Sequence, residues 1–389
     1  MARLRHDGSG SDWPHRVHLL CSAPSTGGVS FMGDLVRRHF ERQAEACARL
    51  HSPFTARLLN LAAARLAAVT NFSAQILDWP DARMRDDALA LRFAGALHAA
   101  VLSGRAPGLA SLYPAGGGAD ADDDALWHAI LGLMQDEDAF LSEILTHPPQ
   151  TNETGRAAVL MLGFQAVARA TGLPLGLLEL GASAGLNQNW DRFHYDLGGS
   201  TFGDRASAVH LKPEWRGRAP DLQPITVRSR AGCDRNPLNV GDPAECLRLR
   251  SYIWPDQPER LARLDGAIAI ARDAGLRLAR ADAADWAAAS LMTLTPGQAT
   301  TVYHSIFWQY LPQETQDNLR STIEVAGSLA TADTPFAWVR MEPWEEDPKC
   351  AALFVTVWPD PERQVLALCD YHGRWIEPRD PVAGQRLSA

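Results

Sequence analysis

The stretch "LLELGASAGLN", residues 177–187, joins a short apolar run to a turn rich in glycine. Short apolar runs of this kind are typical of buried strands, and the following "SAGLNQNWDRF" has a helical pattern. Two interpretations fit the turn itself. Residues 181–185, "GASAG", match the G-x-S-x-G elbow of serine hydrolases, and they also match a nucleotide-binding turn in which one glycine is replaced. The surrounding elements therefore have to decide between the two.

Apolar runs and helical segments alternate on the C-terminal side of this turn. Such alternation predicts an α/β fold with a Rossmann-like, doubly wound sheet whose strands are mainly parallel. The runs "LFVTVWP" and "QVLALCDYHGRWI" are separated only by a turn rich in Pro and Asp, so they predict an antiparallel closing hairpin at the sheet edge. Further strands are expected at 225–233, 276–281, 300–305 and 336–341, and helices at 258–272 and 313–326.

The N-terminal part has a different period. Segments such as "GDLVRRHFERQAEACARL" repeat apolar residues at helical spacing, which predicts an α-helical domain over residues 32–149. Residues 1–31 show no periodicity and are interpreted as a disordered leader. Residues 150–389 then form the Rossmann-like domain, with insertions at 193–223 and 237–257.

The composition of the chain excludes some classes of binding partner. The chain has 389 residues, 46% of them hydrophobic, and a formal charge of -9. This charge argues against nucleic acid or an anionic membrane as a partner and favours a small molecule. Six scattered cysteines without C-x-x-C spacing form no zinc or disulfide pattern, and no apolar run is long enough for a membrane span, so a cytoplasmic location is expected. No metal site is predicted, and the oligomeric state is left open.

The order of the elements favours the nucleotide interpretation. A hydrolase elbow needs an earlier strand whose loop supplies an oxyanion-hole N–H, and no run before Leu177 predicts one. Its acid and histidine would have to come from Asp282 or Glu342 and from His304 or His372. A dinucleotide-binding turn, G-x-G-x-x-G, would need further glycines where Ser183 and Leu186 stand.

The remaining pattern resembles the class I S-adenosylmethionine-dependent methyltransferases over residues 172–389. The resemblance implies S-adenosylmethionine as cofactor. It implies that Asp234, at the end of the second strand, holds the ribose hydroxyls and that Asp282 faces the adenine amine. The first motif of that family corresponds to Glu179, Gly181, Ser183 and Gly185, and Asn187 and Ser305 complete the expected cofactor-binding set.

The resemblance also predicts an acceptor side. His304, just past the fourth strand, is the expected base, and Glu342 after the fifth strand is the second candidate. Insertion 237–257 begins at the crevice, so it is interpreted either as a lid over substrate or as an aromatic plug between domains. The expected substrate contacts are Arg250, Tyr252, Trp254, Trp308 and Gln309. The absence of a D/N-P-P-Y motif favours an oxygen or carbon of a small molecule as acceptor.

Four motifs together resemble an uncharacterised bacterial family, domain-of-unknown-function family 2332. They are "HPPQTNETGRAA", "LELGASAGLN", "RNPLNVGDP" and "WPDQPERLARL", and the resemblance extends over nearly the whole chain from Met32. It implies an architecture and no activity. Three functions thus remain open: a methyltransferase, a non-catalytic or differently reacting protein on the same scaffold, and a serine hydrolase.

Overall fold

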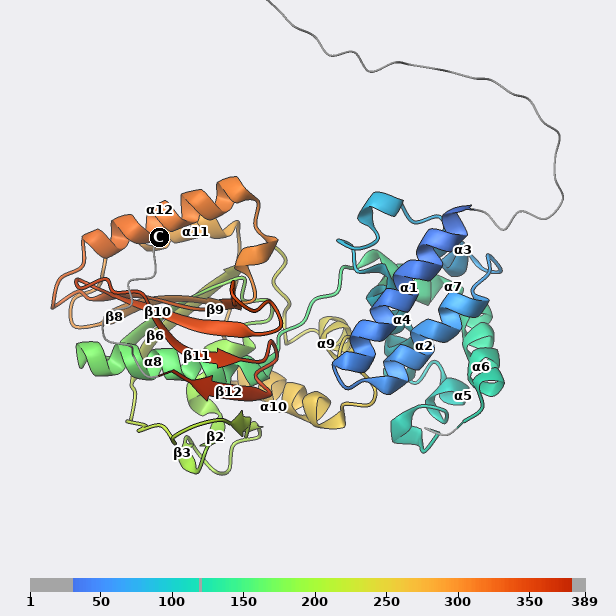
Figure 1. The fold of residues 1–389 in the computed structure, drawn as a ribbon, viewed down its shortest axis with the longest axis horizontal. Helices are drawn as coiled ribbons and strands as arrows, with labels where there is room; N and C mark the ends of the chain where they lie inside the picture. The colour runs from blue at the N-terminus through green and yellow to red at the C-terminus, as the bar shows by residue number, and fades with distance from the viewer. Residues whose placement is uncertain (1–30, 119–120, 380–389) are drawn as a thin grey trace, which may run out of the picture.

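The computed structural model describes residues 31–118 and 121–379 (Figure 1). They form an N-terminal helical region followed by a mixed α/β region, as the sequence predicted. The leader predicted at residues 1–31 lies outside the described residues except for its last position. None of the described helices combines the length and apolarity that crossing a bilayer requires.

The helical region is built around one helix that is apolar on every side. In α4 every residue from Leu89 to Ala100 is buried except the half-buried Leu91, as expected for a helix without a polar face. Its one buried cation, Arg92, donates hydrogen bonds to the last carbonyls of α7. The helices of this region are α1 (Phe31–Arg49), α2 (Pro53–Arg65), α3 (Asn71–Leu77), η1 (Asp81–Arg83), α4 (Leu89–Leu102), α5 (Pro107–Ala110), η2 (Pro114–Gly116), α6 (Asp123–Asp136) and α7 (Asp138–Thr146).

The main sheet lies entirely after residue 174, since no described residue before Leu175 belongs to a strand. Its strands are ordered β5-β12-β11-β10-β9-β8-β1-β6-β7. The five strands from β9 to β7 are parallel to their neighbours. They are β1 (Leu175–Leu180), β6 (Val227–Asp234), β7 (Ala279–Arg280), β8 (Ala299–Ser305) and β9 (Phe336–Pro343).

The chain changes direction across the sheet at β1, because β6 and β7 lie on one side of it and β8 and β9 on the other. Helix α8 (Ala157–Thr171) covers one face, and α11 (Ala283–Ser290) and α12 (Gln313–Ser328) cover the other (Figure 1). Each face has its own apolar core. A sheet covered on both faces is the doubly wound arrangement that the alternation predicted.

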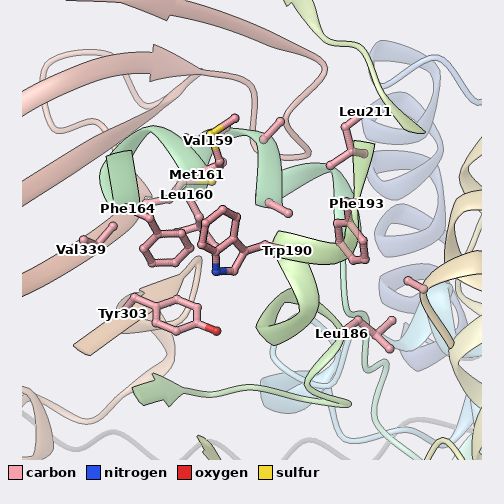
Figure 2. Close-up of a cluster of buried hydrophobic side chains, with 14 of the residues drawn as sticks. Val159, Leu160, Met161, Phe164, Leu186, Trp190, Phe193, Leu211, Tyr303 and Val339 are labelled. Carbon is pink, nitrogen blue, oxygen red and sulfur yellow. The ribbon is translucent and has the colours of Figure 1, made fainter. Parts of the chain in front are cut away.

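One of these cores is centred on Trp190, which lies between α8 and the sheet (Figure 2). Its ring centroid is 4.9 Å from that of Phe164, whose ring meets Tyr303 edge-on at 5.1 Å. Trp190 belongs to η4 (Leu186–Arg192), a 3-10 segment with non-helical torsions at Asn189. The α-helix expected after the glycine turn is therefore wrong in type, because asparagine is a weak helix former and packing of Trp190 holds the kinked form.

The closing strands are antiparallel, as predicted, but there are more of them. Strand β10 (Ala351–Trp358) pairs with β9 and with β11 (Gln364–Cys369), and β12 (Trp375–Pro378) pairs with β11. The run expected as one strand after residue 364 turns back because the Asp370 carboxylate accepts the N–H groups of His372 and Arg374. The strand expected at 276–281 is reduced to two residues, β7, at the sheet edge.

The insertion at 193–223 forms a small separate sheet and adds one strand to the main sheet. The small sheet has the order β3-β2-β4, and β5 pairs with β12. This insertion lies below the α8 layer in Figure 1. Its strands are β2 (His194–Leu197), β3 (Ser200–Phe202), β4 (His210–Leu211) and β5 (Glu214–Trp215).

The insertion at 237–257 joins the two regions. It contains α9 (Pro243–Ser251), which packs on α4, and it leads into α10 (Pro258–Ala274). The Tyr252 ring lies so close to Gly95 that a Cβ there would be 2.6 Å from a ring carbon. Asp256 accepts hydrogen bonds from Ser52 Oγ at 2.6 Å and Phe54 N at 2.9 Å, which caps the start of α2 from the other region.

Candidate functional site

A cavity of about 370 Å³ opens at the carboxyl ends of β1, β6 and β8. Residues that directly follow these strands line it, among them Gly181, Ser183 and Ile306. In doubly wound sheets the ligand crevice lies beyond the carboxyl ends of the strands, where the strand order reverses. The cavity therefore has the position and, at the lower end of a range of roughly 300–1,000 Å³, the size of a small-molecule site.

The turn after β1 has a left-handed backbone at three positions. The φ angles are +63° at Gly181, +56° at Ser183 and +69° at Gly185. Glycine adopts such angles freely, whereas a serine there is uncommon and strained. Gly181 also needs to lack a side chain, because a Cβ would lie 2.2 Å from the ring of Phe307.

The amide N–H groups of this turn are already used within the protein. Asn152 Oδ1 accepts two of them, from Ala184 at 3.2 Å and from Leu186 at 2.9 Å. A phosphate-binding turn leaves such donors free for its ligand, so this turn is poorly suited to a pyrophosphate. The other N–H groups of residues 182, 183 and 185 donate to Cys233 O, Asp234 Oδ2 and Ala182 O.

Glu179, in β1, is the most unusual acid of the cavity wall. It is only 3% exposed, and its Oε2 has no hydrogen-bond partner among the described residues. Burial raises the pKa of Glu179 to about 8, which the neighbouring Tyr303 and Gln188 side chains only partly oppose. At pH 7 this carboxyl group is mostly neutral, so it can donate as well as accept a hydrogen bond.

The two aspartates predicted for the cofactor have different positions. Asp234 lines the cavity at the end of β6, with its carboxylate held by the N–H groups of Ser183 and Asn236, both at 2.8 Å. Asp282 lies beside the wall, where it caps α11 through Ala284 N and pairs with Arg235 at 2.6 Å. The Arg235 guanidinium lowers the pKa of Asp282. Asp234 is thus the better placed to meet a ligand.

Three further residues predicted for the cofactor lie at different places relative to the cavity. Ser305 lines the cavity. Gly185 and Asn187 stand behind the turn: Gly185 packs on Leu278, and Asn187 Nδ2 donates to Glu153 O at 3.2 Å. The structure therefore gathers Glu179, Gly181, Ser183, Asp234 and Ser305 around the cavity, and it leaves Gly185, Asn187 and Asp282 outside its lining.

His304, the expected base, is fully buried next to α12. It lines neither this cavity nor a second cavity, described below, that adjoins it. Its Nε2 accepts the indole N–H of Trp338 at 3.1 Å, so the proton must be on Nδ1, which donates to Glu342 Oε1 at 2.6 Å. Both nitrogens are occupied. This arrangement gives His304 a positioning role and leaves it no contact with a substrate.

Glu342, the second expected catalytic residue, holds the loop that follows β8. Besides the His304 ring, its carboxylate accepts the backbone N–H groups of Phe307 at 3.0 Å and Trp308 at 3.2 Å. This loop contains Ile306 at φ +49°, a value that a β-branched residue rarely adopts. Glu342 therefore stabilises a strained loop and keeps the Phe307 ring against Gly181.

A second cavity, of about 340 Å³, lies between the helical region and the sheet. Three of the predicted substrate residues, Tyr252, Trp254 and Gln309, line it. Arg250 does not, because it pairs with Asp265 at 2.6 Å. Trp308 is also elsewhere, with its ring stacked on His304. Tyr252 packs on Gly95 of α4, as the plug interpretation of the 237–257 insertion expects, and it also lines this cavity. The lid interpretation stays a prediction.

The two cavities meet at Arg156, a residue that the sequence did not single out. Arg156 lines both, and it donates to the carbonyls of Tyr371 at 3.0 Å and Ser305 at 3.2 Å. Behind it, Glu153 forms a buried ion pair with Arg260 at 2.5 Å. Burial alone would raise the pKa of Glu153, but Arg260 and other nearby cations outweigh it and hold the pKa at about 2.

Two histidines line the second cavity. No site role was predicted for His98, and His372 was considered only as the histidine of a serine hydrolase. Burial lowers the pKa of both His98 and His372 to about 4, so both are neutral at pH 7. His98 Nδ1 lies 3.2 Å from the Ser251 carbonyl, which requires the proton on Nδ1 and leaves the lone pair on Nε2. Single histidines on a helix or a turn carry no spacing signal, which explains why the sequence did not reveal them.

The chain matches a known protein family. The model of a family described as "Uncharacterized protein conserved in bacteria (DUF2332)" matches residues 37–377. This range spans the helical region, the sheet and both cavities. Neither a curated protein nor a solved structure matches the chain.

Proposed function

The chain belongs to the bacterial family DUF2332, and we propose that it is an S-adenosylmethionine-dependent methyltransferase acting on an oxygen or carbon of a small molecule. The observation that carries the proposal is the pair of adjoining cavities at the point where the strand order reverses. One has acidic groups at the ends of β1 and β6, and the other is mostly apolar. A transferase needs two such sites, one for the donor and one for the acceptor.

The first cavity suits a nucleoside cofactor that lacks phosphates. Asp234 presents carboxylate oxygens that can accept hydrogen bonds from ribose hydroxyls in addition to its two backbone bonds. Glu179 Oε2 is buried and unpartnered within the described chain, so a ligand group there would remove a desolvation cost. The occupied N–H groups of the turn disfavour phosphates and leave a phosphate-free nucleoside such as S-adenosylmethionine acceptable.

When bound, this cofactor supplies an activated methyl group on a sulfonium. The protein contributes orientation: Phe307 and Gly181 form the wall between the end of β1 and the loop after β8. Glu342 and His304 fix that loop from behind. Because both are fully engaged in hydrogen bonds, the proposed transfer uses them for positioning and does not use His304 as a base.

A serine hydrolase is the second candidate, favoured by the strained φ of +56° at Ser183. A nucleophilic serine needs a base within hydrogen-bond reach. Among the described residues Ser183 Oγ has no hydrogen-bond partner, and no histidine lines the first cavity. Labelling with a fluorophosphonate separates the candidates: a labelled Ser183 with esterase turnover would support the hydrolase, and an unlabelled Ser183 supports the transferase.

Calorimetric titration with S-adenosylhomocysteine tests the proposal. We expect one site per chain and weaker binding in Asp234→Asn, since loss of a charged acceptor costs about 1.5–3 kcal/mol, or roughly tenfold to hundredfold in Kd. Asp242→Asn is the matched control, because Asp242 also accepts a backbone N–H but caps α9 away from the cavity. Absence of heat with the wild type at millimolar ligand, or equal losses in the two variants, would overturn the proposal.

A further inference from the structure

The second cavity adjoins the first. Five residues line both: Pro149, Thr151, Arg156, Ile306 and Tyr310. A molecule held in the second cavity can therefore present one end to the first at Arg156. The opposite end lies in the helical region, against α2 and α4.

The charges around the second cavity are of one sign. No aspartate or glutamate lines it within the described chain, although the protein as a whole carries a charge of -9. Its two lining cations are Arg156 and Arg260. Arg260 is paired with the buried Glu153, whereas Arg156 has no carboxylate oxygen within 4.0 Å among the described residues. Glu153 and Glu342 act on the Arg156 guanidinium only from a longer distance, so this cation at the junction can still pair directly with an anionic group.

The far end of the cavity is mainly apolar, with few hydrogen-bonding groups. Leu58 of α2 and Ala94 of α4 are buried in its wall. Thr55 is also fully buried there, and its hydroxyl has no partner among the described residues. An unpartnered buried hydroxyl facing an apolar pocket suits a ligand whose body is mainly hydrocarbon, with room for one polar substituent.

We propose that this cavity binds a small apolar carboxylic acid, with its carboxylate against Arg156 at the junction and its hydrocarbon body between α2 and α4. This binding mode does not depend on the donor. If the proposed function holds, the carboxylate oxygen is the methyl acceptor. The oxygen lone pair forms the new O–C bond, the C–S bond breaks, and its electron pair remains on sulfur as a neutral thioether.

This reaction fits the side chains at the junction. A carboxylate is already deprotonated at pH 7, so transfer of a methyl group to its oxygen needs no general base. The expected base, His304, has both nitrogens occupied. The proposal therefore selects oxygen over carbon within the wider acceptor class, because none of the five residues that line both cavities is a histidine or a carboxylate that could take a proton from carbon.

The binding test uses a series of acids and their neutral amides: benzoate, phenylacetate, 3-phenylpropionate and hexanoate. Titration of the full-length protein without cofactor is expected to show at least one acid bound tenfold or more tighter than its amide. Arg156→Gln should remove this preference. Equal affinity of every acid and its amide, or no binding of any acid up to tens of millimolar, would overturn the proposal.

Variants that fill the cavity locate the site. Ala94→Phe adds a ring at the apolar end and is expected to reduce acid affinity at least tenfold. Ala166→Phe is the matched control, since Ala166 lines an unrelated cavity near Trp358. Thermal unfolding and S-adenosylhomocysteine titration show whether each variant is folded. Unchanged acid binding in a folded Ala94→Phe variant would contradict the assignment.

The outcomes test the acid site separately from the methyltransferase function, on which only the proposed methylation of the carboxylate rests. Acid binding without S-adenosylhomocysteine binding supports the acid site and refutes the methyltransferase. Cofactor binding without any acid preference refutes the acid site and leaves the methyltransferase. If both bind, mass spectrometry of the bound acid incubated with S-adenosylmethionine should detect its methyl ester, and methylation at carbon would overturn the choice of oxygen.

Discussion

Replacement of Ser183 by glycine should stabilise the protein. The left-handed φ of +56° costs a residue with a Cβ about 1–2 kcal/mol, and the buried, unpartnered hydroxyl adds a desolvation cost of about 1–3 kcal/mol where no water satisfies it. Glycine removes both. Its greater backbone freedom in the unfolded chain opposes this by about 0.5–1 kcal/mol, so a net gain of roughly 1–4 kcal/mol is expected.

The assay is urea unfolding of the wild type and Ser183→Gly. The free energies of unfolding are compared with one shared m-value, the slope of the free energy against urea concentration. Ser103→Gly is the control, because Ser103 has φ -85° at the end of α4 and gains no relief of strain. The control should lose about 0.5–1 kcal/mol. Equal destabilisation of both variants would refute the strain argument.

Three further predictions concern buried carboxylates. Glu342→Gln puts an NH2 group among the N–H donors of the 306–308 loop. It should cost about 2 kcal/mol of stability and weaken S-adenosylhomocysteine binding, whereas the surface variant Glu345→Gln should do neither. Equal calorimetric binding constants for the two variants would contradict this role of Glu342. Glu179, with its pKa raised to about 8, holds a proton that the unfolded chain releases from pH 4.5 upward, so stability should fall as pH rises from 4.5 to 8. Glu179→Gln should remove that component, which urea unfolding at pH 5 and pH 9 measures, and unchanged pH dependence would count against the burial argument. Glu153→Gln leaves Arg260 buried without its partner and should cost about 3–5 kcal/mol, while the double variant with Arg260→Met should recover most of it in the same assay; no recovery would show that the ion pair is not the cause.

The fold was predictable where the chain has a strong period. The apolar runs of β1, β8 and β9 and the helical spacing before residue 149 each reflect burial on the faces that the period identifies. Weakly periodic segments were less informative. The kinked η4 depends on where Trp190 packs, and the division between β11 and β12 depends on hydrogen bonds to Asp370.

The candidate site was predictable mainly at the ends of strands. Residues just after parallel strands meet at one edge of the sheet, which brought Ser183, Asp234 and Ser305 to one cavity. The direction of a side chain within a strand was harder to predict. His304 lies one residue before Ser305, yet it faces the α12 layer, because neighbouring residues of a strand point to opposite faces.

The second cavity was predictable only at three lining residues, Tyr252, Trp254 and Gln309, because the others come from segments far apart in the chain. Thr55 and His98 belong to the helical region, and Arg156 and His372 lie on opposite ends of the α/β region. Thr55, His98 and His372 belong to no recognisable motif, and Arg156 stands in the family motif "HPPQTNETGRAA", which implies no role for it. Only the packing of α4 on α9 brings these side chains together.

A crystal structure grown with saturating S-adenosylhomocysteine tests the central claim most directly. The account predicts density for the ligand in the cavity beyond β1 and β6, with ribose hydroxyls within hydrogen-bond distance of Asp234 and part of the ligand near Glu179 Oε2. A well-ordered structure from the same solution in which this cavity holds only water, or in which the ligand lies elsewhere, would contradict it.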